Sequence, residues 1–225
     1  MSTRLRHTQP LFVFDWDDVI SQTDKLRELS IELLNLSKLP EPIIIATRDE
    51  LLERGGYNFY RHAKLLAKRH PDYEVGLEAV MRIFEKARDR LGSAVYPDAE
   101  RFLRRLHGTY SLAIITIGDP EFQQGKVART GLASLFDHMV FLPAPRGERA
   151  APEAKARVLG QFLEFYPRIF YFEDQPKTIA ALHEKHGRHG RIVPIRVDRK
   201  LESTLKYPNI IRHFDEFDLD RWVAN

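Results

Sequence analysis

The sequence Leu11-Phe12-Val13-Phe14-Asp15-Trp16-Asp17-Asp18 changes abruptly from apolar residues to a group of acids. A short, continuous apolar run is typical of a strand that is buried on both faces of a parallel sheet. We therefore expect a central strand over residues 11–14, with acidic side chains at its C-terminal end.

Short runs of the same kind recur along the chain, rich in β-branched and aromatic residues and separated by helix-like segments. They lie at residues 110–116, 138–142, 169–172 and 191–197. Strands that alternate with helices predict an α/β fold, a Rossmann-like parallel sheet flanked by helices. In such sheets ligands bind beyond the carboxyl ends of the strands, where Asp15, Thr116 and Asp174 all lie.

The segment from Thr23 to Leu91 differs from the rest because its apolar residues follow helical periodicity. It predicts an inserted helical subdomain, residues 22–92, with the α/β core formed by residues 1–21 and 93–225. One helix face is expected to collect the apolar side chains Val80, Ile83, Phe84, Ala87 and Leu91.

Two patterns inside the insert bear on where its helices begin. Thr47-Arg48-Asp49-Glu50 has the spacing of a capping box, which predicts a helix start at Thr47. Ile43-Ile44-Ile45 is compatible with a short strand, a helix entry or a loop, because Pro40 and Pro42 stand beside it.

The composition excludes several classes of protein. The chain has no Cys, so a disulfide framework, a thiolate metal site and a thiol nucleophile are all excluded. Its net charge of +3 comes from 35 basic and 32 acidic residues spread along the chain, which argues against a nucleic-acid partner. No stretch reaches transmembrane length and residues 1–10 contain no apolar signal segment, so we expect a cytoplasmic protein without a membrane partner.

Asp15 and Asp17 are the first candidates for chemistry. Just past the end of a strand, the chain can turn two such carboxylates toward one site, where they repel each other unless a cation or a proton lies between them. The same pair is also typical of solvated turn acids, or of a helix N-cap followed by a first-turn acid. The pair alone leaves both interpretations open.

Four motifs in the same order resemble those of the haloacid dehalogenase-like superfamily. Asp15 and Asp17 match its strand followed by Asp-x-Asp, and Thr116 matches its second strand, which ends in Thr or Ser. Lys155 matches its Lys on the helix before the fourth strand, and stands 19 residues before Asp174, which matches its metal-binding acid. The resemblance covers about residues 11–197.

The fourth motif departs from the family pattern at two positions. Thr178 stands where many members carry a second acid, and Glu173 replaces the more usual Gly or Asp. Magnesium could accordingly be held less tightly, or through Glu173 or water.

The resemblance implies a magnesium-dependent phosphatase that hydrolyses a small phosphomonoester through an aspartyl-phosphate. Asp15 would be the nucleophile, and Asp17 would act as general acid and then base, with a pKa that we expect its neighbours to raise. Phosphate binding is assigned to Thr116, Gly118 and Lys155. Mg²⁺ is assigned to Asp15, Asp174 and the backbone carbonyl of Asp17.

The insert would be the cap that excludes water and selects the substrate. Residues 55–62, Gly-Gly-Tyr-Asn-Phe-Tyr-Arg-His, could reach a substrate, although a turn followed by aromatics of the cap interior is the more common origin of such a stretch. Two other functions stay open: a catalytically weakened binding or regulatory protein, and a phosphatase of nucleic-acid ends. We expect a small phosphorylated metabolite as the partner of a monomer or homodimer.

Overall fold

The computed structural model describes residues 7–54, 57–87, 94–144, 150–187, 190–200 and 209–223. Within them, six parallel strands form one sheet in the order β3-β2-β1-β4-β5-β6. The strands are β1 (Leu11–Phe14), β2 (Ser111–Gly118), β3 (His138–Pro143), β4 (Ile169–Glu173), β5 (Ile192–Val197) and β6 (Ile210–Ile211). The parallel α/β fold is confirmed, and β6 is an addition to the predicted strands.

The central strand β1 contributes side chains to two cores because successive residues of a strand point to opposite faces. Phe12 and Phe14 join the core under α5 (Pro97–Leu106) and α9 (Leu219–Val223), whereas Leu11 and Val13 join the core under α7 (Ala150–Phe162) and α8 (Pro176–His186). All four side chains are fully buried. Each contributes about 1.5–3 kcal/mol of hydrophobic stabilisation, which fixes the strand whose end carries Asp15.

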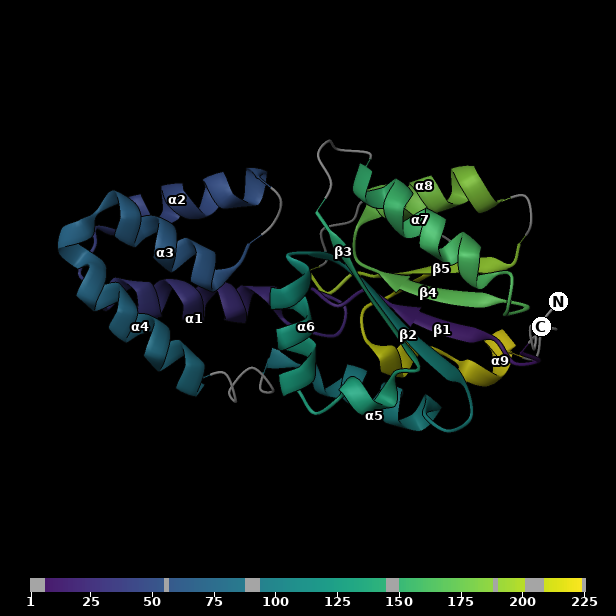
Figure 1. Ribbon diagram of the computed structural model, residues 1–225. Coiled ribbons are helices and arrows are strands. Elements are labelled where there is room, and N and C mark those ends of the chain that lie inside the picture. The colour runs from purple at the N-terminus through teal and green to yellow at the C-terminus, as the bar shows by residue number, and fades with distance from the viewer. Residues whose placement is uncertain are drawn as a thin grey trace, which may run out of the picture.

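Four helices gather to one side of the sheet, on the left of Figure 1. They are α1 (Thr23–Asn35), α2 (Glu41–Glu53), α3 (Phe59–Arg69) and α4 (Glu74–Ala87), with a 3-10 turn at Pro71–Tyr73. Their buried side chains, among them Leu34, Phe59 and Phe84, form a third hydrophobic cluster distinct from the two cores of the sheet. The helical character of the insert matches expectation. The predicted boundary between the insert and the core at residue 92 lies outside the described residues and stays a prediction.

The predicted helix start at Thr47 is wrong. Helix α2 begins at Glu41, after Pro40 as N-cap and with Pro42 in its first turn, and Thr47 lies buried inside it. Proline suits the first turn of a helix because its missing N–H has no partner there and its φ is already helical. The two prolines therefore open the helix, and residues 43–45 are helical.

The apolar face predicted on α4 is correct in part. Val80 and Phe84, four residues apart, are buried in the cluster of the helical insert, but Ile83 is 43% exposed. Leu91 lies outside the described residues. The face is therefore narrower than the sequence pattern suggested.

The remaining helix that matters for the site is α6 (Pro120–Arg129), which stands between the sheet and the helical insert (Figure 1). Asp119 caps it by accepting the N–H of Phe122 at 2.9 Å. The same carboxylate accepts from the Asn58 amide at 3.0 Å and pairs with Arg61 at 2.9 Å, so it also joins α3 to the core. Among the described helices, none is both long and apolar enough to cross a membrane.

Candidate active site

Strand register brings three predicted positions to the same edge of the sheet. Phe14 pairs with Phe172 in β4 and with Ile114 in β2, so Asp15 follows beside Glu173 while Thr116 lies just beyond the level of Phe14. The N–H of Asp15 continues the ladder by donating to the Phe172 carbonyl at 2.9 Å. The carboxyl ends of the central strands thus form the floor of the site.

Lys155 reaches this floor from α7. Its Nζ lies 3.0 Å from Asp15 Oδ2 and 2.8 Å from Glu173 Oε2, and its side chain is 6% exposed. Burial lowers the pKa of Lys155, but the two carboxylates outweigh burial and raise it above the usual range. Lys155 is therefore a fixed positive charge directed at Asp15.

Three carboxylates meet around this ammonium group. Oxygens of Asp15, Glu173 and Asp174 all lie within 4.8 Å of one another. Burial raises the pKa of Asp15 to about 7, helped by repulsion from Glu173 and opposed by Lys155. Burial also raises the pKa of Asp174 to about 9, with repulsion from Glu173 and Asp15 adding to it.

This group of acids fits a magnesium ion. Three carboxylates and one ammonium leave a formal charge of −2, and carboxylate oxygens are the hard ligands that Mg²⁺ prefers. Burial is the main cause of the raised pKa values of Asp15 and Asp174, and repulsion within the group adds to it; a divalent cation would offset that repulsion. Glu173, and not the side chain of Asp17, is the third member of the group, and Thr178 lies buried in α8.

Tyr171 supports Glu173 from below the site. Its hydroxyl donates to Glu173 Oε2 at 2.5 Å, and the N–H of Gln175 donates to Glu173 Oε1 at 3.0 Å. Tyr171 and Glu173 are two residues apart in β4, so their side chains share one face of the strand. Burial raises the pKa of Glu173, but Lys155 and these donors outweigh burial and lower it. Glu173 thus remains an anion that orients Lys155.

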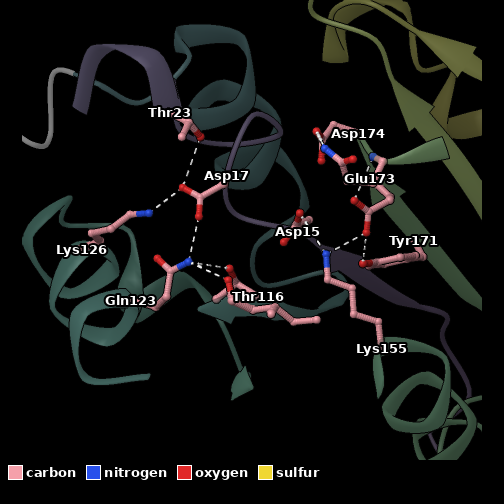
Figure 2. A network of polar contacts seen from close by, with 12 residues as sticks. Asp15, Asp17, Thr23, Thr116, Gln123, Lys126, Lys155, Tyr171, Glu173 and Asp174 are labelled. Carbon is pink, nitrogen blue, oxygen red and sulfur yellow. Dashed lines mark hydrogen bonds and ion pairs between the residues drawn. The ribbon is translucent and has the colours of Figure 1, made fainter. Parts of the chain in front are cut away.

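The chain reverses direction immediately after Asp15. Asp18 has a φ of 59°, in the left-handed region that Asp tolerates better than most residues, and its carboxylate accepts the N–H of Thr23 at the start of α1. Trp16 is fully buried behind the turn. Asp15 and Asp17 consequently point in different directions (Figure 2).

Asp17 is held by residues of α6 and α1. Lys126 Nζ lies 2.5 Å from its Oδ1, Gln123 Nε2 donates to its Oδ2 at 2.8 Å, and the Thr23 hydroxyl donates to Oδ1 at 3.4 Å. Burial raises the pKa of Asp17, but Lys126 and the two further donors outweigh burial and lower it. The expected rise in this pKa is therefore wrong, because the nearest charge is a cation.

Gln123 links Asp17 to the two predicted residues at the end of β2. Its Nε2 also donates to the Thr116 hydroxyl at 3.2 Å, and Thr116 is buried. At Gly118 a Cβ would lie 2.9 Å from Gln123 Nε2, so a side chain at this position would require the amide to shift. Gln123 thus bridges Thr116 and Asp17, as Figure 2 shows, and Gly118 lies beside its amide.

The structure brings Asp15, Lys155 and Asp174 together, and places Asp17 and Thr116 on the neighbouring side (Figure 2). Sequence reasoning missed three contributors: Lys126 and Gln123 hold Asp17, and Tyr171 holds Glu173. A signal for two of them existed. Asp119-Pro120 marks a helix start, after which Gln123 and Lys126, three residues apart, share one helix face.

The stretch 57–62 of the insert serves mainly the interior of the helical cluster. Phe59 is fully buried in that cluster, and His62 is fully buried between Tyr57 and the Ile44 carbonyl, with its pKa lowered to about 4 by burial. Other members of the stretch face the core: Asn58 and Arg61 bind Asp119, and Tyr57 also lines a cavity that reaches Asp17. Gly55 and Gly56 lie outside the described residues.

Comparisons with known proteins agree with this fold. The family model of the haloacid dehalogenase-like hydrolases matches residues 10–184. Among curated proteins, none matches the chain in sequence. Many solved structures share its fold.

One is described as a haloacid dehalogenase-like hydrolase from Burkholderia xenovorans (TM-score 0.70, 17% identity, 96% of this chain and 99% of that one). The HAD-hydrolase YfnB from Bacillus subtilis, bound to magnesium, has a TM-score of 0.61 and 15% identity over 97% of this chain and 100% of its own. A predicted phosphoglycolate phosphatase from Haemophilus somnus has a TM-score of 0.57 and 18% identity over 92% and 96%.

Dehalogenases are also among the similar structures. At these identities the likeness concerns the fold. The family match covers most of the chain, from the first strand through α8. The chain belongs to the haloacid dehalogenase-like hydrolases.

Proposed function

We propose that this hydrolase is a magnesium-dependent phosphatase that cleaves a small phosphomonoester and carries the phosphoryl group transiently on Asp15. The observation that carries the proposal is the contact of Asp15 with Lys155 inside a group of three carboxylates, with a second acid, Asp17, nearby. Bound magnesium, held by Asp15, Glu173 and Asp174, would offset the charge of the phosphoryl oxygens.

Two features favour phosphoryl transfer over dehalogenation. A halide leaves without a proton, so dehalogenation has no use for an acid such as Asp17, whereas a departing alkoxide needs one. Dehalogenases of this class also need no metal, whereas the excess negative charge around Asp15 calls for a cation. A 2-haloacid is therefore the weaker candidate substrate.

In the first step, a carboxylate oxygen of Asp15 bonds to phosphorus while the P–O bond to the organic group breaks. The departing oxygen takes its proton from Asp17. Lys155, held by Glu173, pairs with phosphoryl oxygens as they approach Asp15, and the Thr116 hydroxyl donates to another of them.

In the second step, a water oxygen bonds to phosphorus and the P–O bond to Asp15 breaks. Asp17, now ionised, takes the proton of this water, and inorganic phosphate leaves. Asp15 is regenerated as a carboxylate. Since Lys126 lowers the pKa of Asp17, the acid must gain its proton when the substrate binds. The incoming phosphate favours this because a nearby negative charge raises a carboxyl pKa.

The test is hydrolysis of p-nitrophenyl phosphate with and without Mg²⁺, beside halide release from 2-chloropropionate. We expect phosphate release that depends on Mg²⁺, no halide release, and no activity in an Asp15→Asn variant that keeps the wild-type circular dichroism. Lys64→Gln, an exposed change on α3, is the control and should keep full activity. Halide release without phosphate release would overturn the proposal.

A second candidate is a phosphate-binding or regulatory protein with little turnover. The ion pair between Lys126 and Asp17 favours it, because it keeps the candidate acid unprotonated. Such a protein would bind inorganic phosphate in calorimetry but release none from any phosphomonoester. A phosphatase of nucleic-acid ends has no specific observation in its favour. A cytoplasmic location and a small-metabolite partner stay proposals.

A further inference from the structure

A cavity of about 240 Å³ separates the helical insert from the end of β2. Asp17 and Gln123 line it on the core side, and Phe122 of α6 closes one wall. The opposite walls come from apolar side chains of the insert: Leu26, Ile31, Leu52 and Tyr57. The volume equals about eight water molecules, enough for an organic group of only a few carbons.

This cavity is well placed for the organic part of the substrate. It reaches the carboxylate that would protonate the leaving group, and Gln123 ties that carboxylate to Thr116. A larger cavity of about 440 Å³ lies between α3, α4 and α6, but it is not lined by Asp17. The acids that line it, Glu85 and Glu121, are not the carboxylate that Gln123 ties to Thr116.

The charges of the cavity lining are unbalanced. Asp17 is its one acid among the described residues, and Lys126, which also lines the cavity, already pairs with it. Arg27 and Arg48 add positive charges whose ion-pair partners, Asp24 at 3.5 Å and Asp49 at 2.6 Å, are exposed acids outside the lining. An anionic group in the cavity would restore the balance.

Arg48 is the better placed of these two arginines. Its side chain is 21% exposed, against 55% for Arg27. Its Nε and Nη2 both donate to a single oxygen of Asp49, which is itself 54% exposed and therefore strongly hydrated. Its Nη1 has no acceptor among the described residues, and a planar guanidinium suits a carboxylate, to which it can donate twice.

Gln123 supplies a second point of recognition. Its Nε2 is committed to Asp17 and Thr116, while its Oε1 is buried without a hydrogen-bond donor among the described residues. Gln123 lines the cavity next to Asp17. A hydroxyl or amino group close to the ester bond of a substrate would satisfy this oxygen.

We propose that the natural substrate is a small phosphorylated carboxylic acid bearing a hydroxyl or amino group, bound in this cavity with its carboxylate on Arg48. The inference rests on the proposed phosphatase function. It places the phosphate at Asp15, the donor group at Gln123 and the carboxylate at the insert end of the cavity.

Two pairs of compounds test it, each pair differing at the carboxylate: phosphoserine against phosphoethanolamine, and phosphoglycerate against glycerol phosphate. For the wild type we expect kcat/KM to be about ten- to a hundredfold higher for the acid of each pair, the usual value of a hydrogen bond to a charged group. Arg48→Gln should bring this ratio close to one. Arg54→Gln, an exposed change at the end of the same helix, should keep it.

Failure of the inference and failure of the phosphatase proposal give different results. Hydrolysis of both members of each pair at equal rates, or an unchanged ratio in Arg48→Gln, would overturn the carboxylate site but leave the phosphatase intact. If none of the four compounds is hydrolysed, their binding to Asp15→Asn, measured by calorimetry with Mg²⁺, still tests the carboxylate site. Tighter binding of phosphoserine than of phosphoethanolamine, lost in Asp15→Asn/Arg48→Gln, would support the site, and equal binding would overturn it.

Discussion

Replacing Asp174 by Asn should make the metal-free protein more stable, although it removes a candidate metal ligand. Asp174 is half-buried beside Asp15 and Glu173, and burial with their repulsion raises its pKa from 3.8 to about 9. A carboxyl group whose pKa is raised by folding stabilises the folded state only at low pH. Its contribution is complete below 3.8 and is lost as the pH rises toward about 9.

The size of the effect follows from the same shift. Between the ordinary pKa of 3.8 and a pH of about 8, each pH unit contributes about 1.4 kcal/mol, so the free energy of unfolding would change by about 6 kcal/mol. Water screens the charge of a half-buried carboxylate, so we expect the free energies of unfolding of the two proteins to differ by only about 2 kcal/mol. Asn keeps the shape and can still accept from the Gln175 amide, which donates to Asp174 at 2.5 Å. For a chain of this length the melting temperature would rise by about 4–8 °C.

The assay is thermal unfolding in a chelator at a pH of about 8 and again near pH 4, where the two proteins should differ little. Excess Mg²⁺ should then raise the melting temperature of the wild type, because it binds only the folded state, and raise that of Asp174→Asn much less. Asp72→Asn, an exposed change, is the control and should behave as the wild type. A chelated Asp174→Asn that melts below the wild type at the higher pH would refute the reasoning, as would equal stabilisation of both by Mg²⁺.

Two other substitutions test the contacts that hold the site. Lys126→Met removes the cation 2.5 Å from Asp17 while burial remains, so the pKa of Asp17 should rise. The pH profile of kcat for p-nitrophenyl phosphate should then move to higher pH. The exposed control Lys64→Met should leave the profile unchanged, and an unchanged profile in Lys126→Met would contradict the reasoning. Tyr171→Phe removes a buried hydroxyl that donates to Glu173 at 2.5 Å, so urea unfolding should show a loss of about 1–3 kcal/mol. A loss below about 0.5 kcal/mol would mean that the hydroxyl contributes no net stability.

The parts of the site that could be predicted are those fixed by strand ends. The apolar run at residues 11–14 predicted a strand buried on both faces, and parallel strands end at the same edge, so Asp15 and Asp174 were expected to meet there. Local pattern and topology were sufficient for these two residues. Lys155, whose Nζ lies 3.0 Å from Asp15, was predicted from the resemblance to the family's motif, since its local pattern also suits an exposed lysine on a helix.

The parts that could not be predicted depend on contacts between distant segments. Lys126 is 109 residues from Asp17, and no local pattern shows that the two lie 2.5 Å apart. The direction of the pKa shift of Asp17 was wrong for that reason. The predicted helix start at Thr47 was wrong for a different reason. Its capping pattern competed with Pro40 and Pro42, which fix the backbone more strongly than a side-chain hydrogen bond does.

The central claim is a phosphoryl group carried on Asp15, and acid quenching during turnover tests it most directly. The protein, Mg²⁺ and a phosphomonoester with radiolabelled phosphate are mixed, quenched within a single turnover and digested to peptides. We predict label on the peptide that contains Asp15, reduction of that residue to homoserine by borohydride, and no label in Asp15→Asn. Steady phosphate release with no label on this peptide, and undiminished in Asp15→Asn, would contradict the account.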